Sequence, residues 1–268
     1  MNAAPTKGVP DKLDLLSEAE APLSREADRL TRSAGLRPAY EHRRFEWRRN
    51  FVRWSLSRIA YPWLMRIDAV SGVENIPLSG PAILMFNHIA FVDPLIIISL
   101  LPRNVVPLAK AEVMANPLLA LVPWAYGVIT VRRGEVDRQA LVRSVHVLQA
   151  GEVVLLAPEG TRSPALLPAK EGVAYLAAKT GAPIVPVAVE GTEGFPSLRR
   201  GAFREGPGAT IRFGRGFRFN VGTARPDREA LHRMTEEAMY VLAAMLPPER
   251  RGAYSDLGKA TRETLEFV

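Results

Sequence analysis

The sequence predicts an α/β fold, with a mixed, largely parallel sheet flanked by helices in a single domain. Short apolar runs alternate with helix-length segments from residue 81 to residue 246, a pattern typical of strands joined by helices that cover the sheet. Hydrophobic residues make up 47% of the 268 residues, which is enough to bury a core and excludes a wholly disordered chain. The sequence has no internal repeat, so a solenoid is not predicted.

The individual elements follow from local signals in chain order. Strands are expected at residues 81–86, 105–109, 127–132, 152–157, 183–189 and 209–213. Helices are expected at residues 94–101, 112–126, 137–150, 169–180 and 227–246. Gly151 and Gly181 end two of these helices, because glycine readily takes the left-handed conformation found there. Pro117 and Pro123 interrupt the second helix, and the last one is amphipathic and closes the domain.

The two ends of the chain differ from the central domain at residues 67–248. Residues 1–40 are polar, poor in aromatic residues and punctuated by prolines, so we expect a flexible extension there. The start of the chain has no continuous apolar run of the kind that a secretory signal requires. Residues 249–268 are weakly patterned and are expected to form a C-terminal tail.

Composition narrows the classes of function. The chain has 35 Lys and Arg residues against 28 Asp and Glu residues, a net charge of +7, which favours anionic partners such as a phospholipid surface or a phosphorylated substrate. Nucleic acid is not expected, because no basic and aromatic sheet motif is present. The absence of cysteine excludes a disulfide scaffold, a cysteine nucleophile and an iron–sulfur cluster. No metal-ligand cluster, Walker A loop or nucleophile elbow is found, so no bound metal or cofactor is predicted.

Residues 41–66 are expected to form an amphipathic helical segment. The aromatic residues at helical spacing on one face are Trp47, Phe51 and Trp54. The arginines beside or opposite that face are Arg48, Arg49 and Arg53. Such a helix suits a membrane interface, where rings enter the headgroup region and guanidinium groups meet lipid phosphates. The alternative is a helix that packs its aromatic face on the protein core and leaves its charges in water.

The first candidate site follows the strand at residues 81–86. His88 leaves the carboxyl end of that strand, where α/β folds place their ligands, and Asp93 with Pro94 begins the next helix. A carboxylate in this place can bond one ring nitrogen of His88, fix its tautomer and leave the other nitrogen as a base. The alternative is a purely structural N-cap at Asp93 and a buried histidine that does no chemistry.

Two further strand ends carry polar groups. Residues 158–163 follow the fourth expected strand. The polar or flexible residues of this segment are Glu159, Gly160, Thr161 and Arg162. Backbone amides near Gly160 together with Arg162 would bind an anion, and a surface turn with a salt bridge is the alternative. The strand at residues 127–132 ends in two adjacent arginines, of which at most one can enter the site.

At these residues the sequence resembles the lysophospholipid and glycerolipid acyltransferase family. The residues that match its His-x4-Asp block are Asn87, His88 and Asp93. The other matching segments are residues 127–133, residues 158–163 and the apolar run that reaches Pro186. Order and spacing agree over about residues 65–215, which makes the combination far more specific than any one block. Ala157 stands where the family has Phe, and we expect this departure to affect packing.

The resemblance implies a peripheral or monotopic enzyme of phospholipid biosynthesis at the cytoplasmic face of the cell membrane. It would move a fatty acyl chain from acyl-CoA or acyl carrier protein to the free hydroxyl of 1-acyl-sn-glycerol-3-phosphate (lysophosphatidate), giving phosphatidate. His88 would be the general base and Asp93 would orient it. The alternatives are a sibling enzyme that acts on a lyso-ornithine lipid, a lysophospholipid or a glycolipid, and a non-catalytic lipid-binding protein.

The resemblance also implies roles for individual residues within an acyltransferase domain at residues 67–248. The residues implied to bind the phosphate and glycerol of the acceptor are Arg133, Glu159, Gly160, Thr161 and Arg162. The residues implied to support the site are Asn87, Lys110 and Pro186.

Overall fold

The computed structural model describes residues 41–60, 66–115, 117–132, 137–193, 195, 208–220 and 226–268. The expected extension at residues 1–40 lies outside these residues. None of the helices in the described part of the chain is both long and apolar enough to cross a membrane.

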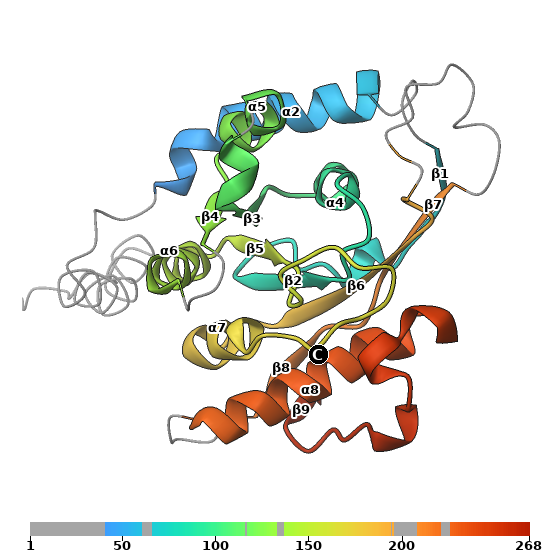
Figure 1. The fold of residues 1–268 in the computed structure, drawn as a ribbon. Helices are drawn as coiled ribbons and strands as arrows, with labels where there is room; N and C mark the ends of the chain where they lie inside the picture. The colour runs from blue at the N-terminus through green and yellow to red at the C-terminus, as the bar shows by residue number, and fades with distance from the viewer. Residues whose placement is uncertain are drawn as a thin grey trace, which may run out of the picture. The chain divides into compact units, whose positions relative to one another are not determined.

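The described residues contain a nine-stranded sheet, shown in Figure 1. Its strands are β1 (Ile67–Ser71), β2 (Ala82–Phe86), β3 (Val105–Lys110), β4 (Ile129–Val131), β5 (Val153–Leu156), β6 (Ile184–Glu190), β7 (Ala209–Phe213), β8 (Phe217–Phe219) and β9 (Leu265–Phe267). The order across the sheet is β1-β7-β6-β2-β5-β3-β4, with β8 pairing β6 and β9. Pairing is parallel from β6 through β4, and β6 is antiparallel to β7 and β8. The predicted mixed, largely parallel sheet is therefore confirmed.

Helices cover both faces of the sheet (Figure 1). The helices are α2 (Glu46–Ser55), α4 (Asp93–Leu100), α5 (Pro117–Tyr126), α6 (Arg138–Gln149), α7 (Gly172–Thr180) and α8 (Arg228–Ala244). Side chains of α2, α4 and α5 pack in one core layer, and those of α6, α7 and α8 pack in the other. Strand β2 supplies both layers, because Leu84 points into the first and Ile83 and Met85 point into the second, as the two-residue period of a strand requires. Each such buried side chain contributes roughly 1.5–3 kcal/mol.

Three of the observed strands were not predicted from the sequence. Strand β1 lies at one end of the sheet order, and β8 and β9 each have three residues. Strand β9 pairs with β8 in an antiparallel register that places Phe267 opposite Phe217. The expected C-terminal tail is therefore tied into the same sheet as the rest of the domain.

Helix α2 turns its aromatic residues outward. Trp47, Phe51 and Trp54 are 68%, 61% and 55% exposed, whereas Val52 and Leu56 belong to the core. The alternative in which the aromatic face packs on the core is therefore wrong. The rings lie along the solvent side of the helix, away from the side that packs against α4 and α5.

Two of the arginines expected at a lipid surface point into the protein instead. Arg49 is only 3% exposed, and its guanidinium donates to the carbonyls of Tyr126 (3.0 Å) and Gly127 (3.1 Å) at the end of α5. Arg53 donates to the carbonyl of Leu101 and to Asn104. The expectation that Arg49 and Arg53 meet lipid phosphates is therefore wrong, because carbonyls without helical partners satisfy their charge inside the fold.

Candidate active site

The carboxyl ends of β2, β5 and β6 meet at one edge of the sheet. The three strands are neighbours and run parallel, so the residues that follow them emerge side by side. These residues are His88 after β2, the segment 158–163 after β5, and Thr192 after β6. The edge thus collects polar side chains from three separate parts of the chain.

His88 and Asp93 form a hydrogen-bonded pair. The ring Nδ1 of His88 lies 2.9 Å from Oδ2 of Asp93, and the same oxygen accepts the backbone amides of Ile89 (2.6 Å) and Ala90 (2.8 Å). Because Oδ2 accepts two amides, it carries no proton of its own, which assigns the donor role in the pair to Nδ1 of His88. Nε2 then keeps its lone pair, as a base requires.

Asp93 does not act as the N-cap that the structural alternative expects. It is the first residue of α4, with Pro94 in the first turn, and the N-cap position is occupied by Val92. Its carboxylate faces back to the His88 loop, where it accepts the two upstream amides. The structural N-cap reading of Asp93 is therefore wrong, and the residue organises the loop.

Asn87 directly follows β2, and Pro186 lies inside β6. The buried side chain of Asn87 bridges to β6, because its Nδ2 donates to the carbonyl of Val189 (2.9 Å) and its Oδ1 accepts the Val189 amide (2.8 Å). Pro186 is in the interior of β6 opposite Met85 of β2, and its carbonyl accepts the amide of Gly214 (2.8 Å). Both residues hold strands together.

The segment after β5 forms a tight turn beside two lysines. Gly160 has φ 64°, a left-handed conformation that favours glycine. The Nζ of Lys110 donates to Oγ1 of Thr161 (3.1 Å), and a Cβ added to Gly160 would lie 3.7 Å from Nζ of Lys170. Two ammonium groups therefore approach the turn, and Arg162 is exposed next to it. Such a turn suits an anion.

Two of the residues expected to bind the acceptor are not found on the surface of the turn that the structure describes. Arg133 lies outside the residues that the structure describes. Glu159 is 6% exposed, and its Oε2 accepts the amide of Leu167 (2.9 Å). Burial raises the pKa of Glu159 to about 7, against the lowering effect of the amides of Leu167 and His88, which both donate to it. Glu159 thus faces the loop backbone rather than an open site.

Sequence reasoning missed Thr192, which is buried and whose hydroxyl donates to Oδ1 of Asp93 (2.6 Å). It follows an apolar strand and Gly191, so the same strand-end argument that found His88 could have found it.

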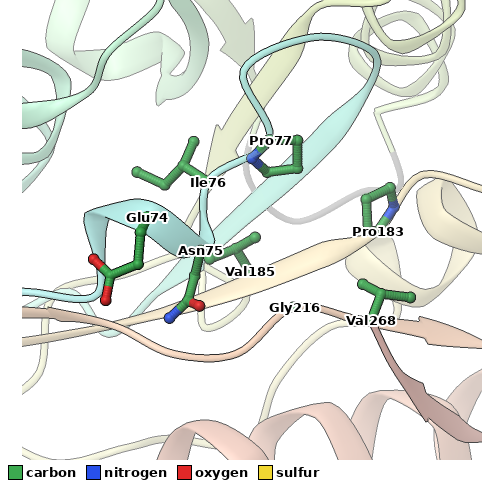
Figure 2. A pocket seen from close by; sticks show the side chains of 8 residues that line it. All are labelled: Glu74, Asn75, Ile76, Pro77, Pro183, Val185, Gly216 and Val268. Carbon is green, nitrogen blue, oxygen red and sulfur yellow. The ribbon is translucent and has the colours of Figure 1, made fainter.

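No metal centre competes for this role in the described part of the chain. No group of three or more His, Asp or Glu side chains is placed to hold a metal ion there. A cavity of about 260 Å³ lies elsewhere in the described part of the chain, and Figure 2 shows the side chains around it. It is lined by Glu74, Asn75, Ile76, Pro77, Pro183, Val185, Gly216 and Val268. Pro183 and Val185 mark the amino end of β6, so this cavity lies at the sheet edge opposite to His88.

Comparison with known proteins finds a family that matches the segment containing the site. Residues 69–190 match the family model described as Acyltransferase. This segment contains His88, Asp93 and the turn at residues 158–163. The acyltransferase resemblance expected from the motifs is therefore confirmed.

Individual relatives carry a more specific name. A 1-acyl-sn-glycerol-3-phosphate acyltransferase of Borreliella burgdorferi is 37% identical over 138 residues, which are 50% of this chain and 55% of that protein. The 1-acyl-sn-glycerol-3-phosphate acyltransferase alpha of Homo sapiens is 31% identical over 160 residues, 58% of this chain and 56% of that protein. The chain thus spans about half the length of these curated relatives.

A solved structure shares the fold. The crystal structure of the 1-acyl-sn-glycerophosphate (LPA) acyltransferase PlsC from Thermotoga maritima superposes with a TM-score of 0.51 at 22% identity. The match covers 80% of this chain and 79% of that chain. At this identity the likeness supports the fold alone.

Proposed function

We propose that this protein transfers a fatty acyl chain from an acyl thioester to the free hydroxyl of 1-acyl-sn-glycerol-3-phosphate, giving phosphatidate. One observation carries the proposal: Asp93 holds Nδ1 of His88 at 2.9 Å and leaves Nε2 available beside a turn suited to an anion. The names of the relatives supply the acceptor. The thioester is that of coenzyme A or of acyl carrier protein.

The reaction needs one proton transfer in each direction. Nε2 of His88 accepts the proton of the acceptor hydroxyl as its oxygen attacks the thioester carbonyl, and Asp93 stabilises the imidazolium that forms. When the carbon–sulfur bond breaks, the departing thiolate takes that proton and leaves as a thiol. The new ester remains on the acceptor, and no acyl-enzyme forms.

The acceptor phosphate binds at the turn of residues 158–163. Thr161 there offers a hydroxyl, and the ammonium groups of Lys110 and Lys170 stand beside it. Arg162 is exposed at the rim and Arg133 is expected to join it, and a guanidinium can hold a phosphate in bidentate fashion. Glu159 does not contact the phosphate itself and instead accepts hydrogen bonds from the backbone of the loop.

The membrane surface is the second partner that we propose. Helix α5 lies against α2, with the Arg48 guanidinium 5.5 Å from the Trp47 ring and 5.3 Å from the Trp124 ring. The exposed apolar side chains on these helices and on the turn after α2 are Trp47, Phe51, Trp54, Ile59, Leu121 and Trp124. Arg43, Arg44 and Arg58 are exposed on the same segment. Aromatic rings flanked by arginines fit an anionic bilayer, so the protein would work as a peripheral enzyme at the cytoplasmic face of the cell membrane.

A radiolabelled acyl-transfer assay tests the proposed reaction. Purified protein would receive palmitoyl or oleoyl thioesters of coenzyme A or carrier protein, with lysophosphatidate, a lyso-ornithine lipid or a lysophospholipid as acceptor. We expect phosphatidate from the wild type and a loss of about 10²- to 10⁴-fold in His88→Ala. The control is His232→Ala, because His232 also lies near a carboxylate, Glu171 at 3.8 Å, but on the surface.

The outcomes separate the candidate functions. Transfer to another lysolipid alone would keep the chemistry and change the acceptor. An absence of transfer to every acceptor, from folded protein on vesicles, would contradict the proposal and favour a lipid-binding role.

A further inference from the structure

The Asp93 carboxylate has a fourth hydrogen bond, which comes from a distant part of the chain. Oγ1 of Thr192 donates to Oδ1 of Asp93 at 2.6 Å, and both side chains are fully buried. Thr192 lies two residues beyond the segment that matches the family model. The residue therefore contacts the histidine–carboxylate pair without belonging to any block that carries the resemblance.

We propose that Thr192 is a positioning residue, which fixes the plane of the Asp93 carboxylate and through it the ring of His88. The proposal rests on the proposed acyl transfer for its kinetic consequence. Its structural content, that the Thr192 hydroxyl holds the hydrogen bond between His88 and Asp93 in place, is independent of the substrate.

The two oxygens of Asp93 are held unequally. Oδ2 accepts hydrogen bonds from Nδ1 of His88 and from the backbone amides of Ile89 and Ala90. Oδ1 accepts a hydrogen bond from the hydroxyl of Thr192. The terminal torsion of an aspartate is broad, so three donors on one oxygen do not define the carboxylate plane. A fourth donor on the other oxygen does.

The fold holds the Thr192 hydroxyl by its backbone. Gly191 has φ 72°, and a Cβ there would lie 2.4 Å from the carbonyl oxygen of Gly208, so the turn before Thr192 requires glycine. The Thr192 carbonyl accepts the amide of Phe195 (3.1 Å). The next residue, Glu193, pairs with Arg250 of the C-terminal segment. Thr192 is thus fixed from β6, whereas His88 and Asp93 are fixed from β2 and α4.

The test compares two substitutions of Thr192. Thr192→Val keeps the shape and removes the donor, whereas Thr192→Ser keeps the donor. We expect kcat to fall about 10- to 100-fold in Thr192→Val with KM unchanged, because a hydrogen bond to a charged group is lost and the base is misoriented. Thr192→Ser should restore most of the rate. Thr235→Val is the matched control, since the buried Thr235 hydroxyl donates to a carbonyl of its own helix, away from the site.

A second readout needs no turnover. The Nδ1 proton of His88 gives an NMR resonance, identified by its absence in His88→Ala. We expect this resonance in the wild type and in Thr192→Ser, and its loss through exchange with water in Thr192→Val. Wild-type kcat together with an unchanged resonance in Thr192→Val would overturn the proposal, as would equal losses of rate in both Thr192 variants. A wild type that acylates no acceptor would overturn the proposed function, and the resonance would still decide the role of Thr192.

Discussion

The carboxyl edge of the sheet buries polar groups, whereas the outer face of helices α2 and α5 exposes apolar ones. At the edge, polar groups are buried and bonded: Asp93 accepts four donors, and Asn87 bridges two strands. On the outer face, Trp47 is exposed while Arg49 is buried. The proposed function gives this difference a reason: a proton-transferring base requires fixed geometry, whereas a bilayer contact requires apolar side chains that the fold leaves exposed.

The largest expected effect breaks the edge and leaves the outer face intact. Asp93→Asn removes the acceptor that defines the His88 tautomer, so kcat should fall about 10²- to 10⁴-fold while binding to vesicles persists. Steady-state acyl transfer and co-sedimentation measure the two properties. Asp227→Asn is the control, because Asp227 caps α8 and asparagine caps as well. A small loss in Asp93→Asn would contradict the assignment of this pair.

The second prediction concerns the arginine that the outer face hides. Arg49→Met leaves the carbonyls of Tyr126 and Gly127 without their donor, so the free energy of unfolding should fall by about 2–4 kcal/mol. Arg48→Met removes a half-buried arginine that lies over aromatic rings and should cost less than about 1 kcal/mol. Urea denaturation compares them. Equal losses would contradict a stabilising role for the inward hydrogen bonds of Arg49.

The third prediction adds a pH dependence to the edge. The pKa of Glu159 is about 7 in the fold, above its ordinary value of 4.5, so the folded state binds more protons between these values. Stability from this group is then full below pH 4.5 and is lost as pH rises to 7. Glu159→Gln should remove that slope, worth up to about 3 kcal/mol. The measurement is urea unfolding across this pH range.

The exposed Glu229 provides the control for that measurement. Glu229→Gln should keep the pH dependence of the wild type. A Glu159→Gln variant with an unchanged slope would mean that Glu159 titrates as a solvated carboxyl.

The fourth prediction breaks the outer face and leaves the edge intact. Replacement of Trp47, Phe51 and Trp54 by Ser should lower partitioning onto anionic vesicles roughly 10- to 100-fold, because three rings no longer leave water. Stability should change little, since the rings are exposed. Leu78→Ser, which removes another highly exposed side chain, should leave partitioning unchanged. Wild-type partitioning of the triple variant would exclude this face as the membrane contact.

Local signals explain which parts of the fold were predictable. Gly151 and Gly181 have φ 77° and 66° at the helix ends where they were expected, and the Asp137 side chain caps α6 by accepting the amide of Ala140 (3.0 Å). Strands β8 and β9 had no such signal. They have three residues each and depend on a pairing between Phe217 and Phe267, which are far apart in the sequence.

The site shows the same division. His88 and Asp93 are five residues apart, so one strand end and one helix start were enough to pair them. Thr192 is 99 residues from Asp93, so its place at a strand end could be predicted from the sequence but its contact with Asp93 could not. Arg49 was misplaced because helical periodicity counts arginine as a polar, outward residue, whereas the carbonyls at the end of α5 make an inward position favourable.

One measurement tests most directly whether the sheet edge performs the chemistry and the outer face the membrane contact. It compares the triple aromatic variant with Asp93→Asn on two forms of the acceptor. One form is lysophosphatidate in anionic vesicles, and the other is a short-chain lysophosphatidate that stays monomeric in water. We predict that the triple variant loses transfer on vesicles and keeps it on the monomeric acceptor, whereas Asp93→Asn loses both. Equal losses on both acceptors in the triple variant would contradict the account.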